Sequence, residues 1–507
     1  MKFISTRDIT VDVKGSEAIV KGLSNDGGLF VPQSFPAVSQ EDIEAFTEME
    51  YAERAAFVIN KFVPEIGYET LLDSANKAYS KFDGEPAPVV KLDENLFVME
   101  LWHGPTHAFK DIALTLLPYL MTSSKKLIGA DERTLILVAT SGDTGKAALE
   151  GFKDVEGTDI IVLYPEEGVS DLQKLQMMTQ KGNNVKVCAI KGNFDDAQTA
   201  VKKIFTDKEM AEKLLENGVK LSSANSINWG RLVPQITYYF SAYADLLASG
   251  EIESGEEVNF CVPSGNFGNI LAGYYAKRMG LPVNKLICAS NKNNVLTDFL
   301  NKGEYDINRE FYKTTSPSMD ILISSNLERL VFELSGRDDK VTATRMAQLK
   351  TEKTYSITNN ELAQLKKDFY AGCAGEDEVA DTLGRYFDEY GYIADTHTSV
   401  GLYVYEQFVA STDDEHKTVV LSTASPYKFV NDVLVAIGEK PEKDEMKALE
   451  KLENVTALPL PDSLKELPSL KKLHTDSVNK EEVPAVVLAY EKKSRQEKRT
   501  GREKDSI

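Results

Sequence analysis

A single lysine stands at the entrance to a strongly apolar stretch of the chain. Residues 99–118 read Met-Glu-Leu-Trp-His-Gly-Pro-Thr-His-Ala-Phe-Lys-Asp-Ile-Ala-Leu-Thr-Leu-Leu-Pro, and the run from Ile112 to Met121 is apolar on almost every side. Such a run belongs in a core, where an amine is costly unless it is neutral, paired or covalently used. Because burial lowers the pKa of an amine, Lys110 is a candidate for Schiff-base chemistry. A lysine that reaches from a helix end to water would give the same pattern.

Two glycine-rich loops each join a predicted strand to a predicted helix. Residues 139–146 read Ala-Thr-Ser-Gly-Asp-Thr-Gly-Lys, and residues 263–269 read Pro-Ser-Gly-Asn-Phe-Gly-Asn. A helix N-terminus offers free N–H groups and the positive end of the helix dipole, so both loops are candidate anion sites. Glycines also let the backbone close around a phosphate. Either loop taken alone is equally consistent with an ordinary turn.

Neither loop matches a nucleotide-binding motif. A P-loop needs glycine five residues before Gly145 and Ser or Thr after the lysine, and the chain has Thr140 and Ala147 there. The second loop lacks the G-x-G-x-x-G spacing of a dinucleotide fold. The sequence therefore disfavours a P-loop nucleoside triphosphatase.

Two further stretches add polar groups that could bind a ligand. Residues 223–231 (Ser-Ala-Asn-Ser-Ile-Asn-Trp-Gly-Arg) end in an arginine, which suits bidentate capture of phosphate or carboxylate. Residues 421–429 (Leu-Ser-Thr-Ala-Ser-Pro-Tyr-Lys-Phe) leave a buried strand at its carboxyl end, where ligands of α/β sheets gather. A plain helix cap and a plain strand exit are the structural alternatives. Together the four stretches and the lysine suit one cofactor and one anionic substrate, a combination that pyridoxal phosphate requires.

Composition restricts the class of protein. The chain has 507 residues, enough for two or three domains. It carries 58 Lys and Arg against 79 Asp and Glu, for a net charge of −21. This balance argues against nonspecific binding to nucleic acid or to an anionic membrane. An anionic ligand would need a positive pocket inside an acidic exterior.

Cysteine usage and hydropathy bear on the compartment. The four cysteines are far apart and form no C-x-x-C pair, which indicates buried thiols rather than a disulfide or metal framework: Cys188, Cys261, Cys288 and Cys373. No apolar run approaches the roughly 18 residues of a membrane span. The N-terminal residues show no apolar core of signal length. We expect a cytoplasmic protein with no metal.

Hydrophobic patterns predict an α/β fold. Short alternating segments are expected around 9–13 and 18–20, a strand at 29–32, and helices over 40–82 that are interrupted at Pro64 and Gly67. Buried strands are then predicted, separated by helices, at 135–139, 160–164, 185–190, 259–262, 286–289 and 419–422. This alternation favours largely parallel sheets. From 438 the chain is charged and rich in proline, and we expect residues 492–507 to be disordered.

The quoted motifs closely resemble the long-form threonine synthases, which are fold-type II pyridoxal-phosphate enzymes with a tryptophan synthase β-like fold. The resemblance runs from residues 25–32 (Asn-Asp-Gly-Gly-Leu-Phe-Val-Pro) through 103–111 to 423–429, and leaves the charged C-terminus unsupported. It implies two α/β domains with parallel sheets, an extra N-terminal domain and a C-terminal extension. The implied limits are 1–95 for the N-terminal domain, 96–437 for the catalytic region (with a substrate-loop subdomain at about 125–245 and a cofactor-phosphate half at about 246–437) and 438–507 for the extension.

The resemblance also implies roles for individual residues. Lys110 would be the catalytic Schiff-base lysine, and Thr423 would face the pyridine nitrogen. The cofactor phosphate would be held by Gly265, Asn266, Phe267, Gly268 and Asn269. The substrate carboxylate would be bound by Ser141, Gly142, Asp143 and Thr144, and the substrate phosphate by Asn225, Ser226 and Arg231.

Two residues depart from the family's pattern. Ser425 stands where a histidine is expected in Thr-Ala-His-Pro, and His107 stands where an apolar residue is common. An imidazole three residues before Lys110 could tune the proton transfers of that lysine.

The implied activity is that of a carbon–oxygen lyase acting on a phosphate ester. O-phosphohomoserine and water would give threonine and phosphate, the last step of threonine biosynthesis. Another fold-type II lyase, such as a dehydratase or a β-replacing synthase, is the nearest alternative. A catalytically inactive relative is the other. Monomer and homodimer are both compatible with the sequence.

Overall fold

The computed structural model describes residues 1–140, 142–167 and 169–504, and of residues 493 and 495–504 it describes the backbone alone. The chain forms two compact units, and each is built from two separate segments. Unit 1 comprises Met1–Leu116 and Asn225–Leu460, and unit 2 comprises Leu117–Ala224 and Pro461–Ile507. The domain limits expected from the sequence do not coincide with these, because the last segment of the chain joins unit 2 instead of standing alone.

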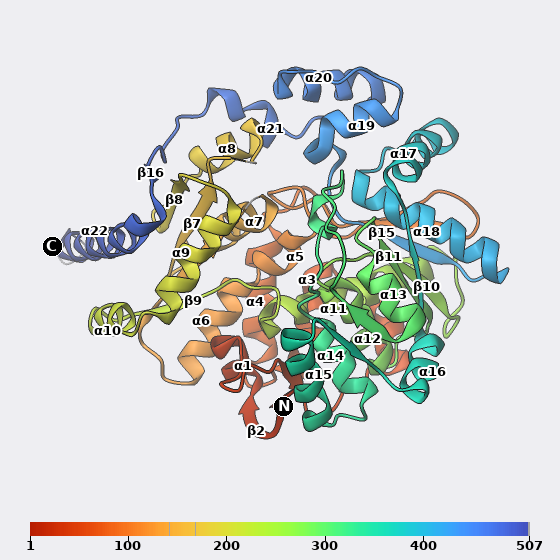
Figure 1. Cartoon of the computed structure of the whole chain (residues 1–507), viewed down its shortest axis with the longest axis horizontal. Coiled ribbons are helices and arrows are strands. Elements are labelled where there is room, and N and C mark those ends of the chain that lie inside the picture. Colours follow the sequence, from red (N-terminus) through yellow and green to blue (C-terminus); the bar gives the residue numbers. More distant parts are fainter. Residues whose placement is uncertain (141, 168, 505–507) are drawn as a thin grey trace. The chain divides into compact units, whose positions relative to one another are not determined.

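Unit 1 is organised around a six-stranded sheet (Figure 1). Its order is β14 (Phe369–Cys373), β11 (Val283–Ser290), β10 (Val258–Pro263), β15 (Thr418–Ser422), β5 (Leu96–Glu100) and β4 (Val89–Lys91). The first five strands are parallel, and β4 pairs antiparallel with β5 at the edge. The strands predicted at 259–262, 286–289 and 419–422 are therefore confirmed.

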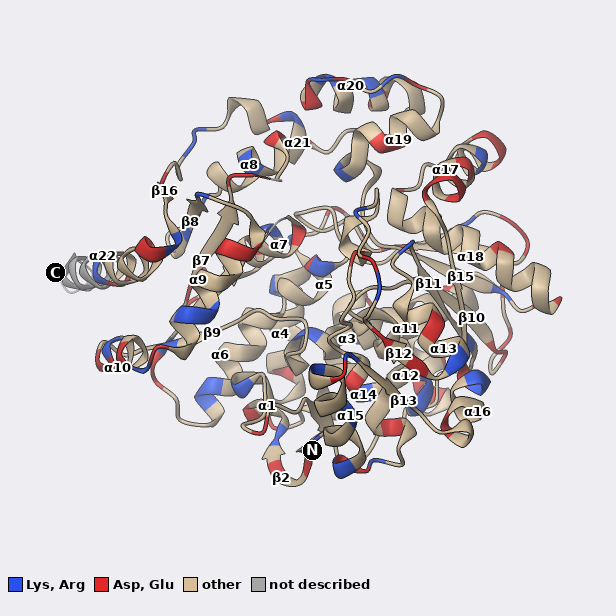
Figure 2. Cartoon of the chain, viewed as in Figure 1, with Lys and Arg blue, Asp and Glu red and all other residues tan. Residues whose placement is uncertain are grey.

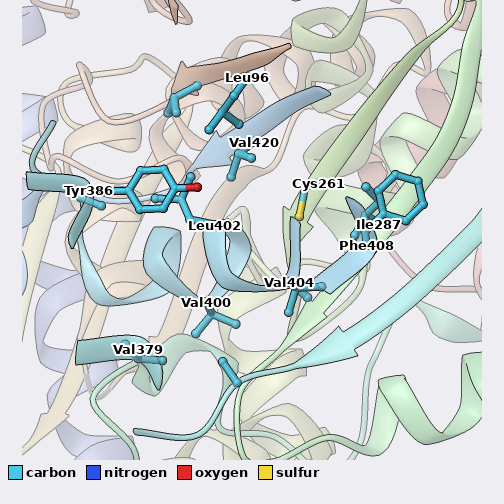
Figure 3. Packing of buried hydrophobic residues seen from close by; sticks show 14 of the residues in the cluster. Leu96, Cys261, Ile287, Val379, Tyr386, Val400, Leu402, Val404, Phe408 and Val420 are labelled. Carbon is cyan, nitrogen blue, oxygen red and sulfur yellow. The ribbon is translucent and has the colours of Figure 1, made fainter. Parts of the chain in front are cut away.

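Helices α17 (Glu376–Tyr390) and α18 (Thr396–Thr412) build the core on this sheet. Figure 3 shows side chains of both helices among those of the strands, including Val379, Tyr386, Val400, Leu402, Val404, Leu96, Cys261, Ile287 and Val420. Every one of them is buried. The core thereby holds the middle of α18 against the strands of the sheet.

The N-terminal part of unit 1 begins with a small antiparallel sheet in the order β2 (Asp8–Lys14), β1 (Lys2–Ser5), β3 (Phe30–Pro32). The short alternating segment expected around 18–20 is not found, because these residues belong to helix α1 (Gly15–Lys21). Both Ala18 and its neighbour Ile19 are buried, and the helix ends at Gly22 with φ 70°. Three apolar residues are too few to distinguish the period of a strand from that of a helix.

The remaining helices of the N-terminal part are interrupted as predicted at Pro64 and Gly67: α2 (Gln40–Ala45), α3 (Tyr51–Phe62) and α4 (Tyr68–Tyr79). The apolar run at 112–121 is not one helix. Helix α5 (Lys110–Leu114) ends before α6 (Leu117–Leu127) begins, and the two belong to different units.

Buried α11 (Trp229–Ala248) packs against α3, α5 and α12 (Gly268–Met279).

Unit 1 also contains further helices and short strands. They are α13 (Val295–Lys302), β12 (Glu304–Asp306), η2 (Pro317–Met319), α14 (Leu327–Leu334), α15 (Asp339–Thr351), β13 (Thr354–Ser356), α16 (Asn359–Asp368), η3 (Pro426–Phe429), α19 (Val430–Ala436) and α20 (Glu445–Thr456).

Unit 2 contains a five-stranded parallel sheet in the order β16 (Ser477–Val478), β8 (Val185–Ile190), β7 (Thr158–Pro165), β6 (Arg133–Ala139), β9 (Val219–Ser222). The strands predicted at 135–139, 160–164 and 185–190 are confirmed, and the two larger sheets are largely parallel as expected. The helices of this unit are α6, α7 (Asp143–Phe152), α8 (Asp171–Met178), α9 (Phe194–Thr206), α10 (Lys208–Glu216), α21 (Asp462–Lys465) and α22 (Val483–Lys504).

The C-terminal segment is part of the fold of unit 2. Strand β16 pairs with β8, and Val483 and Val487 of α22 are buried in the core of the unit. Helix α22 continues to Lys504, through most of the tail that was predicted to be disordered. A helix anchored in the core can extend through Lys, Arg and Glu, which are good helix formers. Residues 505–507 lie outside the described residues.

Charged residues of both signs lie along the helices of both units, and α17 begins with a run of acidic residues (Figure 2). Within the described ranges, no helix has both the length and the apolar character that crossing a bilayer requires.

Candidate active site

Lys110 is the first residue of α5 and is half-buried. Its Nζ donates a hydrogen bond to the hydroxyl of Ser318 at 3.2 Å. The preceding turn reverses the chain through His107, whose φ is 58°. Below the turn, the buried carboxylate of Asp111 accepts hydrogen bonds from Thr106, and a Cβ on Gly104 would lie 2.5 Å from the Asp111 side chain. The His-Gly-Pro-Thr motif is thus a turn built around Asp111 that delivers Lys110.

The end of β15 lies beside this turn. The carbonyl of Thr423 accepts the N–H of Phe109 at 2.9 Å, and the N–H of Ser425 donates to the carbonyl of His107 at 3.0 Å. These two backbone hydrogen bonds hold buried Thr423 beside the turn that precedes Lys110. At Ser425, the residue that departs from the family's pattern, the hydroxyl accepts the N–H of Tyr427 and caps η3.

The second glycine-rich loop joins β10 to α12 in unit 1. Phe267 adopts the left-handed conformation with φ 61°, and α12 starts at Gly268. The carbonyl of Gly265 accepts the hydroxyl of Ser324 at 2.7 Å, and that of Asn266 accepts the N–H of Asn326 at 3.1 Å. Since the loop carbonyls face residues 324–326, the N–H groups that open α12 are the donors suited to an anion.

Asn269 offers a further donor at this loop. Its Oδ1 accepts the hydroxyl of Tyr238 and, at 3.1 Å, that of Tyr239. Its Nδ2 is buried and has no hydrogen-bond partner in the described part of the chain. A buried amide donor normally has an acceptor, and a phosphate oxygen would supply one. The residues present therefore fit the phosphate of pyridoxal phosphate.

Lys110 and the loop are brought together by Ser318. A Cβ on Gly265 would lie 2.8 Å from the carbonyl oxygen of Ser318, so the two backbones are in close contact. The hydroxyl of the same serine accepts the hydrogen bond from Lys110. Ser318 thus contacts both the amine of Lys110, which could react with an aldehyde, and the loop at 265–269, which could bind a phosphate.

The stretch that precedes α11 reaches the same loop. The hydroxyl of Ser226 lies 3.3 Å from that of Ser325, which donates to Asn266 Oδ1 at 3.3 Å. Asn225 is exposed, and its Oδ1 accepts the N–H of Ile227 at 3.3 Å. Ser226 is therefore linked through Ser325 to the loop at 265–269, and Asn225 precedes it in the chain.

Arg231 lies in the first turn of α11 with 4% of its surface exposed. Burial lowers the pKa of its guanidinium to about 10. A buried guanidinium is best satisfied by an anion that accepts two hydrogen bonds, and a phosphate ester does so.

The first glycine-rich loop belongs to unit 2. Thr140 organises it: the Thr140 hydroxyl accepts the N–H groups of Gly142 and Gly145, each at 3.1 Å. Helix α7 begins at Asp143, followed by Thr144. A Cβ on Gly145 would lie 2.2 Å from the Thr140 side chain, so a residue with a side chain would not fit at this position. Ser141 lies outside the described residues.

Three family profiles match the chain. Residues 2–79 match "Threonine synthase N terminus", residues 83–424 match "Pyridoxal-phosphate dependent enzyme", and residues 398–487 match "Threonine synthase, C-terminal". The crystal structure of PLP-bound threonine synthase from Brucella melitensis is similar with a TM-score of 0.87 and 38% identity, covering 97% of this chain and 99% of that one. The yeast threonine synthase structure gives a TM-score of 0.88 at 34% identity, with the same coverage.

The chain belongs to the threonine synthase family of pyridoxal-phosphate enzymes. Its fold is fold type II, its cofactor is pyridoxal phosphate, and the family's chemistry is that of a lyase. Threonine synthase from Pseudomonas aeruginosa is 37% identical over 90% of this chain and 96% of that protein. Threonine synthase-like 1 from Macaca fascicularis is 40% identical, and the match spans 86% of this chain but only 61% of that protein.

Sequence reasoning missed several residues of this threonine synthase-type site. Ser318 lies in the short helix η2, and Ser324, Ser325 and Asn326 lie between η2 and α14. This stretch has no motif, and only its Ser-Ser-Asn run indicates hydrogen bonding. Arg329 is fully buried and donates to the carbonyls of Phe30 and Ile227 at 3.0 and 2.6 Å. It ties the small N-terminal sheet to the stretch that contains Asn225 and Ser226.

Proposed function

We propose that the protein is a threonine synthase, which converts O-phosphohomoserine and water to threonine and phosphate. The observation that supports this best is the pairing of two anion-binding arrangements in unit 1. One is the loop at 265–269 beside Lys110, and the other is the stretch with Ser226 and buried Arg231. A dehydratase substrate carries no phosphate and would not need the second arrangement. The related Threonine synthase-like 1 from Macaca fascicularis is considerably longer than this chain, which matches 61% of it. The activity of the whole protein is therefore part of this proposal.

The proposed division of labour follows from the residue types. Pyridoxal phosphate, when bound, supplies an aldehyde that condenses with amines and a ring that delocalises the negative charge left by a departing proton. Residues 265–269 would hold its phosphate, Thr423 would face its ring nitrogen, and Lys110 would anchor it. Gly142, Asp143 and Thr144, with Ser141, would bind the substrate carboxylate.

Lys110 would also move the protons of the reaction. A neutral amine can take a proton from the α-carbon of the substrate and return it later, as general acid–base catalysis requires. Arg231, with Asn225 and Ser226, would stabilise the charge that develops on the leaving phosphate. Because that guanidinium is buried, its interaction with the phosphate is weakly screened by solvent.

The compartment and assembly belong to the same proposal. All four cysteines are free thiols, three of them buried, as expected for a cytoplasmic protein. A monomer or a homodimer would both provide the residues named above.

The test is an assay of purified full-length protein with O-phosphohomoserine, measuring phosphate by a coupled colour reaction and threonine by chromatography. Equal amounts of the two products are expected. Serine and threonine are offered in parallel, and formation of an oxo acid from them without phosphate release would favour a dehydratase. Cofactor bound at Lys110 without turnover of any of the three would favour an inactive relative.

A further inference from the structure

A buried histidine–carboxylate pair lies at the start of α18. Asp395 is the N-cap residue and is fully buried, and its Oδ2 lies 2.8 Å from His397 Nδ1. The same oxygen accepts the N–H of His397 at 3.0 Å, and the other accepts the N–H of Thr398 at 3.0 Å. His397 itself is 3% exposed. The cap therefore fixes the imidazole in position.

The opposite ring nitrogen of His397 faces the segment that carries Ser318. The N–H of Ser318 donates to His397 Nε2 at 3.1 Å, so Nε2 must carry a lone pair. The proton of a neutral imidazole is then on Nδ1, where Asp395 accepts it. Two hydrogen bonds thus select one tautomer, and this tautomer holds the backbone of Ser318.

We propose that Asp395 and His397 are positioning residues for Ser318, and that the Ser318 hydroxyl orients the amine of Lys110. The hydroxyl accepts one N–H of Lys110 at 3.2 Å, which directs the lone pair of a neutral amine away from Ser318. The segment is held from a second side as well, because the hydroxyl of Thr396 donates to the carbonyl of Thr315 at 2.7 Å. Asp395 thus orients His397, His397 positions Ser318, and the Ser318 hydroxyl orients the amine of Lys110.

The catalytic role of this arrangement rests on the proposed function. The experiment that tests it does not, because it measures only the binding of cofactor. Capture of pyridoxal phosphate by Lys110 needs no substrate. The amine must attack the aldehyde carbon with its lone pair correctly directed, forming a C=N bond while the aldehyde oxygen leaves as water with the two amine protons. Binding of 4-deoxypyridoxine 5′-phosphate, which has no aldehyde, reports only on the phosphate and ring sites. Comparing the two ligands separates orientation of the amine from integrity of the loop.

The experiment uses the full chain freed of cofactor, as wild type and as Ser318→Ala, His397→Leu, His397→Gln and Asp395→Asn. Capture is followed by the visible absorption of the bound cofactor, with reduction and peptide mapping to Lys110. His416→Gln is the matched control, because exposed His416 also pairs with a carboxylate two residues earlier, Asp414, at 3.2 Å. Thermal midpoints are recorded for each variant.

Ser318→Ala and His397→Leu are expected to slow capture about tenfold or more, while affinity for the deoxy ligand stays within about threefold. His397→Gln should recover part of the rate, since its carboxamide oxygen can accept the N–H of Ser318. Capture at the wild-type rate in Ser318→Ala would overturn the proposal. So would equal weakening of both ligands, which would mean a structural role alone. Absence of phosphohomoserine turnover in the wild type would count against the proposed function and leave this comparison intact.

Discussion

The carboxylate of Asp111 accepts both the N–H and the hydroxyl of Thr106, at 2.8 and 2.6 Å. Both residues are buried, and Asp111 directly follows Lys110 in α5. Replacement of Asp111 by Ala would leave two buried donors without this acceptor, at a cost of about 1–3 kcal/mol each. We expect Asp111→Ala to lower the thermal midpoint and to slow cofactor capture. Differential scanning fluorimetry and the visible absorption band measure the two effects.

A second substitution tests the same turn from the other side. A Cβ at position 104 would lie 2.5 Å from the Asp111 side chain, closer than real Cβ contacts allow. Gly104→Ala should therefore reproduce the loss expected for Asp111→Ala, and the double variant should lose little more because the two changes disturb one contact. Full additivity of the two losses would contradict this interpretation of the turn.

Removal of the lysine amine is the most direct test of the anchor. Lys110→Ala should abolish both turnover and the visible absorption of bound cofactor, because no other group in the proposed mechanism condenses with the aldehyde. Lys110→Arg is the matched control: it keeps the positive charge and cannot form the linkage. Threonine formation retained by either variant would refute the proposed mechanism.

Much of the α/β framework could be predicted from the sequence because its strands are buried on both faces. The runs at 135–139 and 160–164 are continuously apolar, the run at 185–190 is interrupted only by Lys186, and the structure has strands at all three. Strand β16 could not be predicted, since Ser477 and Val478 have no distinguishing pattern and pair only because β8 presents a free edge. Residues 18–20 were misjudged for the related reason that three residues define no period.

The candidate site was predictable where chemistry imposes a motif and not where it depends on tertiary contact. Lys110 and the loop at 265–269 stand out by composition, and the structure links them through Ser318. Ser318 and His397 are far apart in the chain and ordinary in type, so that only the fold gives them a common role. The roles of the substrate residues remain predictions.

The close approach of Gly265 to Ser318 predicts a specific intolerance. A Cβ at position 265 would lie 2.8 Å from a backbone carbonyl, which cannot move aside as a side chain does. We expect Gly265→Ala to weaken cofactor binding about tenfold or more, measured by titration with 4-deoxypyridoxine 5′-phosphate. Gly375→Ala is the control: its Cβ would meet the end of the flexible Glu378 side chain at 2.6 Å, and that side chain can rotate away. Equal losses in both variants would contradict the argument.

Arg231 decides between the proposed substrate and its rivals. Arg231→Lys keeps a positive charge but loses the bidentate geometry, so kcat/KM for O-phosphohomoserine should fall about 10- to 100-fold, and inhibition by inorganic phosphate should weaken in parallel. Cofactor absorption should not change. Arg385→Lys is a control. Arg385 on α17 forms a bidentate ion pair with Glu406 on α18, in which both hydrogen bonds are 2.8 Å long. Unchanged kinetics in Arg231→Lys would remove this residue from the phosphate site.

The buried pair of Arg345 and Glu361 predicts a pH dependence of stability. Two hydrogen bonds of 2.7 Å join the groups, and the N–H of Thr358 also donates to the carboxylate. Burial alone would raise the pKa of Glu361, but these hydrogen bonds outweigh it and hold the pKa below its ordinary value. A lowered folded-state pKa means that the carboxylate stabilises the fold above the unfolded-state pKa of about 4.3, and that this contribution is lost as pH falls through the folded-state value.

Glu361→Gln should therefore lower the thermal midpoint at pH 7, because it leaves a buried guanidinium without its counter-charge, a loss of about 3 kcal/mol or more. The difference from wild type should stay constant between about pH 6 and 8 and shrink as the pH falls below about 4, where the wild-type carboxylate also takes up a proton. Thermal scans of both proteins across this range measure it. Since the pair lies on α15 and α16 rather than among the candidate site residues, turnover at 25 °C should be retained, and a gap between the proteins that widens in acid would reverse the assigned sign of the pKa shift.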